Sequence, residues 1–114
     1  MYNVALRIMP EVIRSLAFGS TGASYVAIGD ALEHPSRILI INNLTNATMM
    51  FSFDGINDHI ALSGPGSFTF DVSANSAKNS GAYIAQGTTI YTKRVGTPSS
   101  GSVYIMSFYA SDGR

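Results

Sequence analysis

One short stretch of the sequence brings together side chains that could do chemistry. Residues 51–60, FSFDGINDHI, place two aspartates, an asparagine and a histidine within six positions, namely Asp54, Asn57, Asp58 and His59. Carboxylate, amide and imidazole groups can hold a metal ion, and a carboxylate beside a histidine can support general acid/base catalysis. The spacing and the surrounding elements have to decide among a metal loop, a catalytic pair and a simple turn.

The spacing excludes a calcium loop of the EF-hand type. Such a loop needs oxygen ligands at its first, third and fifth positions, glycine at the sixth and glutamate at the twelfth. Counted from Asp54, the third position is Ile56, the sixth is His59 and the twelfth is Pro65. We assign no metal site to this stretch.

A catalytic centre built on His59 lacks its partners. Asp58 or Asp54 could orient the imidazole, and Ser52 or Ser63 could serve as a nucleophile. The neighbouring sequence, however, offers no nucleophile elbow, and the other histidine of the chain, His34, lies in an expected loop. We therefore assign no catalytic or cofactor-binding residues, and we expect a protein that is not an enzyme and carries no cofactor.

The same stretch is typical of a hairpin turn. Asp54 and Gly55 follow an aromatic run and precede a β-like run. Glycine accepts a positive φ, and aspartate can accept a hydrogen bond from its own backbone. We interpret residues 54–58 as a hairpin loop in which Asp54 and Gly55 form the structural turn, while Asn57 and Asp58 are candidate contacts with a partner.

The composition indicates an unusual surface. Charged residues make up 12% of the 114 residues, against about 25% in a typical soluble domain. Ser, Thr, Asn and Gly cover much of the surface instead. Two interpretations stay open: part of the surface is buried against other copies or partners, or the chain is a small β domain with a hydroxyl-rich surface.

Several classes of function are excluded by composition. The chain has no cysteine, which rules out disulfides, thiolate metal sites and cysteine nucleophiles. Seven basic and seven acidic residues cancel, and no basic cluster exceeds the pair Lys93 and Arg94, so we expect no nucleic-acid partner. No apolar run approaches the roughly 20 residues that cross a bilayer, so we expect a soluble, non-secreted chain without a membrane partner. In such a chain the N-x-T patterns at Asn43 and Asn46 are turn residues and not glycosylation sites.

The elements that position these residues are short strands. From residue 36 onward, β-branched and aromatic runs alternate with Gly, Pro, Asn and Ser clusters, which is typical of an all-β sandwich or barrel. The expected strands are SRILIIN (36–42), MMFSF (49–53), HIALS (59–63), SFTFDV (67–72), AYIAQ (82–86), TTIYTKRV (88–95) and GSVYIMSFYA (101–110). We predict a single antiparallel β-sandwich, jelly-roll-like, with about eight strands and an extended N-terminal arm.

The last expected strand is apolar on both faces. Val103 and Ile105 point to one side, whereas Tyr104, Met106 and Phe108 point to the other. Strands of this kind are normally covered on both sides. The pattern predicts that a second sheet or a neighbouring subunit covers the second face.

The beginning of the chain is less regular. We assign residues 1–13 to an N-terminal arm or first strand and residues 14–114 to the β-sandwich domain. Residues 10–18 fit either a strand or a helix of two turns, and we favour the strand because a β-like run follows. The apolar arm can reach a neighbouring subunit, and the loop 73–81 is the longest break in the second half of the chain. Further candidate assembly contacts are therefore Tyr2, Val4, Leu6 and Ile8 in the arm and Lys78 in the loop.

Three motifs give the chain a family resemblance. N-x-T stands at 43–45, S-x-D-G-x-x-D-H at 52–59 and G-S-V-Y at 101–104. They lie in the stretches RSLAFGSTGASYVAIGDAL, PSRILIINNLTNATMMFSFDGINDHIAL and GTTIYTKRVGTPSSGSVYIMSFYA. With these motifs the chain resembles small virion structural proteins of tailed bacteriophages, in which a strand ending in N-x-T leads to such a hairpin and a G-S-V-Y strand closes the chain.

The resemblance implies a non-enzymatic accessory protein that is made in the host bacterial cytoplasm and repeated by symmetry in the virion. Its partners would be other copies of itself, as a homo-oligomer, and other virion proteins of the capsid, portal or tail. Two placements stay open, a decoration or cement protein on the capsid and a ring component at the head-to-tail junction or tail. The alternative function is a carbohydrate- or receptor-binding β-sandwich whose site is formed by the loops 54–58 and 73–81.

Overall fold

A computed structural model describes residues 7–72 and 83–111 of the chain. These residues contain no α-helix; one 3-10 turn, η1 (Phe18–Ser20), follows the second strand. The strands are β1 (Arg7–Pro10), β2 (Arg14–Ala17), β3 (Val26–Ala27), β4 (Ser36–Asn43), β5 (Met49–Ser52), β6 (Ile60–Leu62), β7 (Gly66–Asp71), β8 (Tyr91–Arg94) and β9 (Ser102–Ser111). The predicted all-β class is confirmed.

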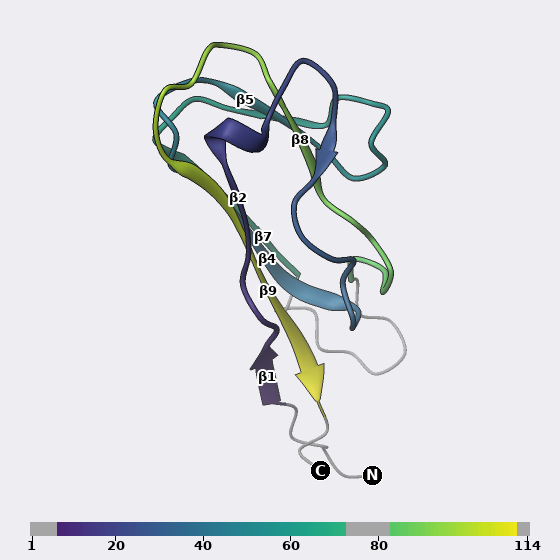
Figure 1. Cartoon of the computed structure of the whole chain (residues 1–114). Helices are drawn as coiled ribbons and strands as arrows, with labels where there is room; N and C mark the ends of the chain where they lie inside the picture. The colour runs from purple at the N-terminus through teal and green to yellow at the C-terminus, as the bar shows by residue number, and fades with distance from the viewer. Residues whose placement is uncertain (1–6, 73–82, 112–114) are drawn as a thin grey trace, which may run out of the picture.

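The strands form two antiparallel sheets (Figure 1). Sheet A has the order β1-β9-β4-β7, and β2 also pairs with β9, while sheet B has the order β3-β8-β5-β6. β1 pairs with the last part of β9, from Phe108 to Ser111, and β2 pairs with its first part, from Ser102 to Ile105. β1 and β2 therefore lie end to end along one edge of β9 and share a single strand position.

The connections follow the jelly-roll pattern. Every connection from β2 to β9 passes from one sheet to the other, except the hairpin between β5 and β6. Two four-stranded sheets joined in this way are the jelly-roll form of the β-sandwich. Because β1 and β2 occupy one position, the nine strands fill the eight positions of that fold, as the sequence predicts.

The core lies between the two sheets, where alternate residues of facing strands point inward. Its fully covered side chains are exposed by at most 2%; they are Ile28, Leu32, Leu39, Ile41, Met49, Phe51, Ile90, Val103 and Ile105. On β2 the inward residues Arg14 and Leu16 lie opposite Ile105 and Val103. Residues 14–17 are thus a strand, and the helix considered for this segment is wrong.

Two expected strands are shorter than predicted. In the described part of 82–86, Ile84 forms only an isolated bridge with Ser36, through a pair of backbone hydrogen bonds of 2.8 Å. Gly87 then turns the chain with φ +89°. The expected strand 88–95 is reduced to β8, Tyr91–Arg94, which pairs with β3 and β5.

A buried amide closes the turn between β4 and β5. Asn43 is fully buried and donates to the carbonyl oxygens of Ala47 and Leu62, both at 2.9 Å. Its Oδ1 accepts from the Thr45 hydroxyl at 2.6 Å and from the Thr45 N–H at 3.1 Å. Both N–H donors and both oxygen lone pairs of this amide are therefore used within the protein. The N-x-T motif at Asn43 is therefore a structural turn, and its amide has no access for a glycan.

Candidate functional site

The outer face of sheet A carries apolar side chains where a solvent-facing sheet normally carries polar ones. Leu39 and Ile41 of β4 are fully buried in the core, so their neighbours Ile38 and Ile40 point outward. The strand register places Ile38 directly opposite Phe108 and Ile40 directly opposite Met106. These pairs form a half-buried apolar strip across the two central strands.

Neighbouring strands extend the strip on both sides. On β1, Pro10 lies opposite Phe108, and Ile8, which is 44% exposed, lies opposite Ala110. Tyr104 continues the strip along β9. We call the set the apolar face; it consists of Ile8, Pro10, Ile38, Ile40, Tyr104, Met106 and Phe108.

Hydroxyl side chains border the apolar face. Ser15 of β2 lies opposite Tyr104, and Thr69 of β7 lies opposite Ile40; both are exposed. An apolar centre with a polar rim is the usual anatomy of a protein interface. Sheet B packs on the inner side of β9, where Val103 and Ile105 are fully buried. The second face of β9, which the sequence predicts to be covered, keeps half-exposed side chains in the described part of the chain.

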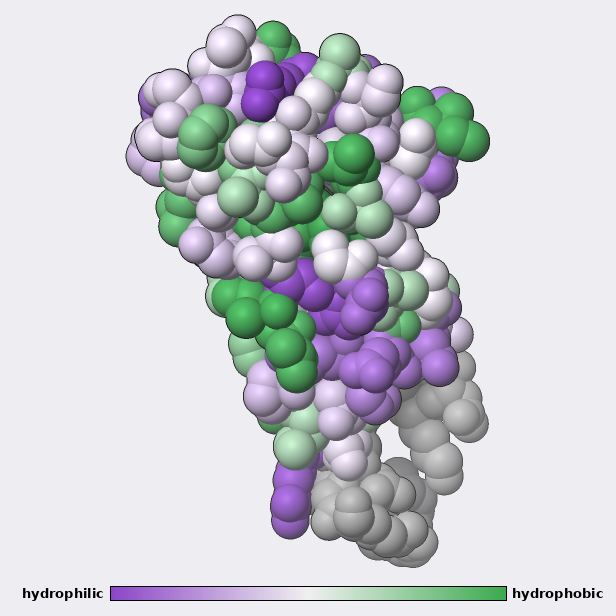
Figure 2. Space-filling model, viewed as in Figure 1, coloured by the Kyte–Doolittle hydropathy of each residue, from purple (hydrophilic) through white to green (hydrophobic). Residues whose placement is uncertain are grey.

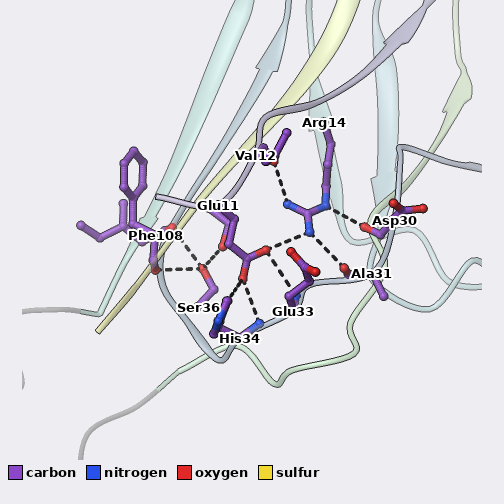
Figure 3. Close-up of polar contacts among 11 residues, drawn as sticks. Glu11, Val12, Arg14, Asp30, Ala31, Glu33, His34, Ser36 and Phe108 are labelled. Carbon is purple, nitrogen blue, oxygen red and sulfur yellow. Dashed lines mark hydrogen bonds and ion pairs between the residues drawn. The ribbon is translucent and has the colours of Figure 1, made fainter. Parts of the chain in front are cut away.

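A charged cluster lies behind β9, on the side of the core. The Glu11 side chain is only 1% exposed, and its backbone N–H donates to the carbonyl of Ser107 at 2.9 Å. Its carboxylate accepts from Arg14 at 2.8 Å, from the N–H and Nδ1 of His34 at 2.8 and 2.9 Å, and from the N–H of Glu33 at 3.3 Å (Figure 3). In the same view the Phe108 ring points away from the cluster.

Arg14 completes the cluster and holds the loop before β4. It is 8% exposed, and its guanidinium donates to the carbonyls of Asp30 at 2.7 Å, Ala31 at 3.0 Å and Val12 at 3.1 Å. His34 in turn stacks on Tyr109, with ring centroids 3.6 Å apart. The cluster therefore connects the segment between β1 and β2 to the loop before β4. Its charged groups are engaged in these structural contacts.

The ionised form of Glu11 is favoured by its contacts. Burial alone would raise the pKa of Glu11, but the hydrogen bonds from His34, Glu33 and Arg14 outweigh burial and hold this pKa below its ordinary value. Glu11 and Arg14 thus form a covered ion pair in which the two charges compensate each other.

An open depression of about 370 Å³ lies next to this cluster. Its apolar wall is formed by Val12 and Ile13, which are 81% and 53% exposed. The remaining lining comes from Arg14, Ser15, Gly29, Asp30 and Glu33. Figure 2 shows hydrophobic atoms directly beside hydrophilic ones midway along this face of the molecule.

The loop 54–58 is held by its own hydrogen bonds. Asp54 Oδ1 accepts from the N–H groups of Asn57 and Ile56 and from the Ser52 hydroxyl, all at 2.8 Å. The backbone N–H groups of Asn57 and Ile56 hold the pKa of Asp54 well below its ordinary range. Gly55 adopts φ +77°, which an L side chain rarely accepts. The Asp54 carboxylate, which could have bound a metal or a substrate, therefore accepts the hydrogen bonds that hold the turn.

Asp58 and His59 are also engaged in structural contacts. Asp58 accepts from the Tyr25 hydroxyl at 2.5 Å and pairs with Lys93 at 3.1 Å; these two contacts lower the pKa of Asp58. His59 Nδ1 accepts from the N–H of Phe53 at 3.0 Å. Neither Asp58 nor Ser52 makes a hydrogen bond to the imidazole, so the arrangement lacks the relay that a nucleophile and base require.

The predicted assembly contacts fall into three groups. Tyr2, Val4, Leu6 and Lys78 lie outside the described residues. Ile8 belongs to the apolar face, whereas Asn57 and Asp58 lie in the β5–β6 loop at the opposite end of the sandwich (Figure 1). The structure therefore does not bring the predicted contacts together into one surface.

Sequence reasoning missed the β4 half of the apolar face and the Glu11 cluster. The signal for the β4 residues was the unbroken apolar run ILII within RILII. A strand with one solvent-exposed face would instead alternate apolar and polar residues. Glu11 and Arg14 were visible as an i, i+3 pair of opposite charges. His34, the partner of Glu11, is 23 positions away and left no local signal.

Further observations concern other classes of site. Among residues 7–72 and 83–111, no three His, Asp or Glu side chains come together as a metal site, and no helix is long and apolar enough to cross a membrane.

Comparisons of the chain with protein-family models, with curated proteins and with solved structures gave no match. The fold and the surface thus define the class of protein: an all-β jelly-roll sandwich with an apolar outer sheet face.

Proposed function

We propose that the protein is a non-enzymatic structural subunit of a tailed-bacteriophage virion, which associates with copies of itself and docks on other virion proteins. The apolar face carries this proposal. A contiguous apolar surface with a polar rim marks a surface that a protein partner covers.

The energetics of the apolar face suit a repeated contact. Covering an apolar patch of ordinary size, about 300 to 600 Å², gives on the order of 10 kcal/mol of gross stabilisation. Loss of translational and rotational freedom offsets about 4 to 15 kcal/mol of it. One such contact is weak alone and becomes strong when symmetry repeats it over many linked copies.

The fold supports the proposal without deciding it. Jelly rolls build viral capsid proteins, and they also build lectins and cupins. The low content of charged residues, 12%, favours a subunit whose surface is shared with other copies. Capsid decoration and the head-to-tail or tail ring remain the two placements.

A second candidate is the carbohydrate- or receptor-binding module. The expected loop 73–81 lies outside the described residues. One observation favours the module: Tyr83, two positions beyond that range, is 59% exposed. At the other proposed loop the Tyr25 hydroxyl is bonded to Asp58, and Lys93 Nζ lies 4.8 Å from the centre of its ring. The face of the ring that Lys93 covers is not open for stacking on a sugar. A glycan array that shows no binding would remove this candidate.

Particle incorporation tests the proposed function. Tagged wild-type protein and a Met106→Lys variant are supplied during growth of a phage that lacks its own copy of the gene, and purified particles are examined by quantitative mass spectrometry. We expect the wild-type protein in a fixed copy number and the variant at a strongly reduced level. Val95→Lys is the matched control, because Val95 is 57% exposed and lies next to β8 of sheet B. A wild-type protein missing from the particles would refute the proposal.

A further inference from the structure

We infer that the depression beside β2 binds the Arg7 end of β1 of a second copy of the chain. The inference rests on the proposed self-association and names a second surface for it, separate from the apolar face. Charge and hydropathy at the two surfaces carry the argument.

The depression presents two uncompensated negative charges. Asp30 and Glu33 are exposed, and in the described part of the chain their carboxylates take part in no hydrogen bond or ion pair. Arg14, the cation that lines the depression, is already paired with Glu11 at 2.8 Å. The surface therefore combines net negative charge with the exposed apolar wall of Val12 and Ile13. A fitting partner carries a positive charge next to an apolar side chain.

Arg7 is the cation of the described residues that remains without a partner. Lys93 pairs with Asp58, Arg94 donates to Thr21 and to the carbonyl of Phe18, and Arg37 has an interaction of its own. Arg7 is exposed at the start of β1, and its side chain makes no hydrogen bond or ion pair there. Met9, two positions on, lies on the same side of β1 as Arg7, is half-buried and supplies the apolar neighbour.

The two surfaces do not meet within one copy. β1 is fixed to β9 by four consecutive register pairs, from Arg7 opposite Ser111 to Pro10 opposite Phe108. Within the described part of one copy, Arg7 makes no ion pair with Asp30 or Glu33. The carboxylates that it meets are therefore those of another copy. A contact between two different surfaces that repeats from copy to copy closes into a ring or continues as a filament.

A charge-exchange experiment tests the contact. Arg7→Glu and the double variant Asp30→Lys with Glu33→Lys are purified, and self-association is measured by sedimentation velocity. Each variant alone places like charges in the contact, and we expect its association to be weaker than that of the wild type by at least about tenfold. A 1:1 mixture of the two variants restores opposite charges at both surfaces, so we expect association close to that of the wild type. High salt weakens the wild-type contact.

Controls separate the contact from folding and from general charge effects. Thermal unfolding verifies that each variant is folded. If a charge reversal lowers Tm, a neutral variant takes its place: Arg7→Gln for Arg7→Glu, and Asp30→Asn with Glu33→Gln for the double lysine variant. Val95→Glu adds a negative charge near sheet B and should leave association unchanged.

Three outcomes would count against the inference. If the wild-type protein associates and the charge variants associate equally well, the depression is not the contact, while the proposed self-association stands. If the mixture does not associate better than its components, the pairing of Arg7 with Asp30 and Glu33 is wrong. If the wild-type protein stays monomeric at every concentration, the contact and the proposed self-association both fail.

Discussion

Ile38 of β4 and Phe108 of β9 are direct cross-strand partners on the outside of sheet A, while their neighbours Leu39 and Ser107 form the adjacent pair on the inside. Leu39 is fully buried against sheet B. The same two strands thus present apolar side chains to the core and to the outside. A sheet with two apolar faces needs two covering layers, and the described residues provide one of them.

The covered ion pair predicts that the stabilisation by Glu11 depends on pH. The pKa of Glu11 is lower in the folded protein than its ordinary value of 4.5. The carboxylate therefore stabilises the fold fully above that value, and the stabilisation is lost as the pH falls through the folded pKa. We expect Glu11→Gln to lower the free energy of unfolding by about 3 kcal/mol at pH 7. Urea unfolding should show this difference shrinking toward pH 3.

Glu33→Gln is the control for that experiment, because Glu33 is exposed and its carboxylate has no partner in the described part of the chain. Its effect should stay within about 0.5 kcal/mol at either pH. A Glu11→Gln difference that keeps its size from pH 7 to pH 3 would show that the carboxylate charge is not what stabilises the cluster.

Three glycine substitutions separate backbone strain from steric contact. Gly55 has φ +77°, and an added Cβ would lie 3.2 Å from the Tyr91 ring. Gly87 has φ +89° with nothing within 4 Å, and Gly19 has neither problem. Alanine should therefore cost least at Gly19, about 1 kcal/mol at Gly87, and more than that at Gly55. Thermal unfolding at one pH measures the order, and equal Tm values for all three variants would contradict it.

The buried amide of Asn43 predicts a large loss of stability on truncation. Asn43→Ala leaves the carbonyls of Ala47 and Leu62 and the N–H of Thr45 without this partner. We expect the free energy of unfolding to fall by about 3 kcal/mol. Asn46→Ala is the matched control, since Asn46 bonds only to Ser99 in an exposed position; it should cost about 0.5 kcal/mol. Comparable losses in urea titrations would argue against the structural role of Asn43.

His59 should be dispensable for assembly. Its Nδ1 accepts from the N–H of Phe53, so His59→Ala should cost about 1 kcal/mol of stability through the loss of one hydrogen bond. Because His59 lies away from the apolar face, the oligomer mass and the copy number in particles should match those of the wild type. Loss of assembly with retained folding would place the loop 54–58 at the interface.

Local patterns predicted the strands well because alternation and turn residues act over a few positions. The run SRILIIN became β4, and Asp54 and Gly55 lie in the loop between β5 and β6. Composition could not predict that β1 and β2 share one edge of β9, because that arrangement depends on the register between residues 85 to 104 positions apart.

The candidate site was predictable on β9 and at one residue of β1. The apolar residues on both faces of β9 indicated that its outer face is covered. Ile8 was predicted as an assembly contact. The cross-strand pairing of Ile40 with Met106 requires the register of β4 against β9. The depression beside β2 joins Val12 with Asp30 and Glu33, which meet only in the folded chain.

The native mass of the protein, measured by light scattering over a range of concentrations, tests the central claim most directly. The wild-type protein should show a mass several times that of the 12.1 kDa chain. A folded double variant, Ile40→Thr with Met106→Lys, should shift strongly toward the monomer, whereas Val95→Lys should keep the wild-type mass. A wild-type protein that stays monomeric, or an oligomer that the double variant leaves unchanged, would contradict the role of the apolar face.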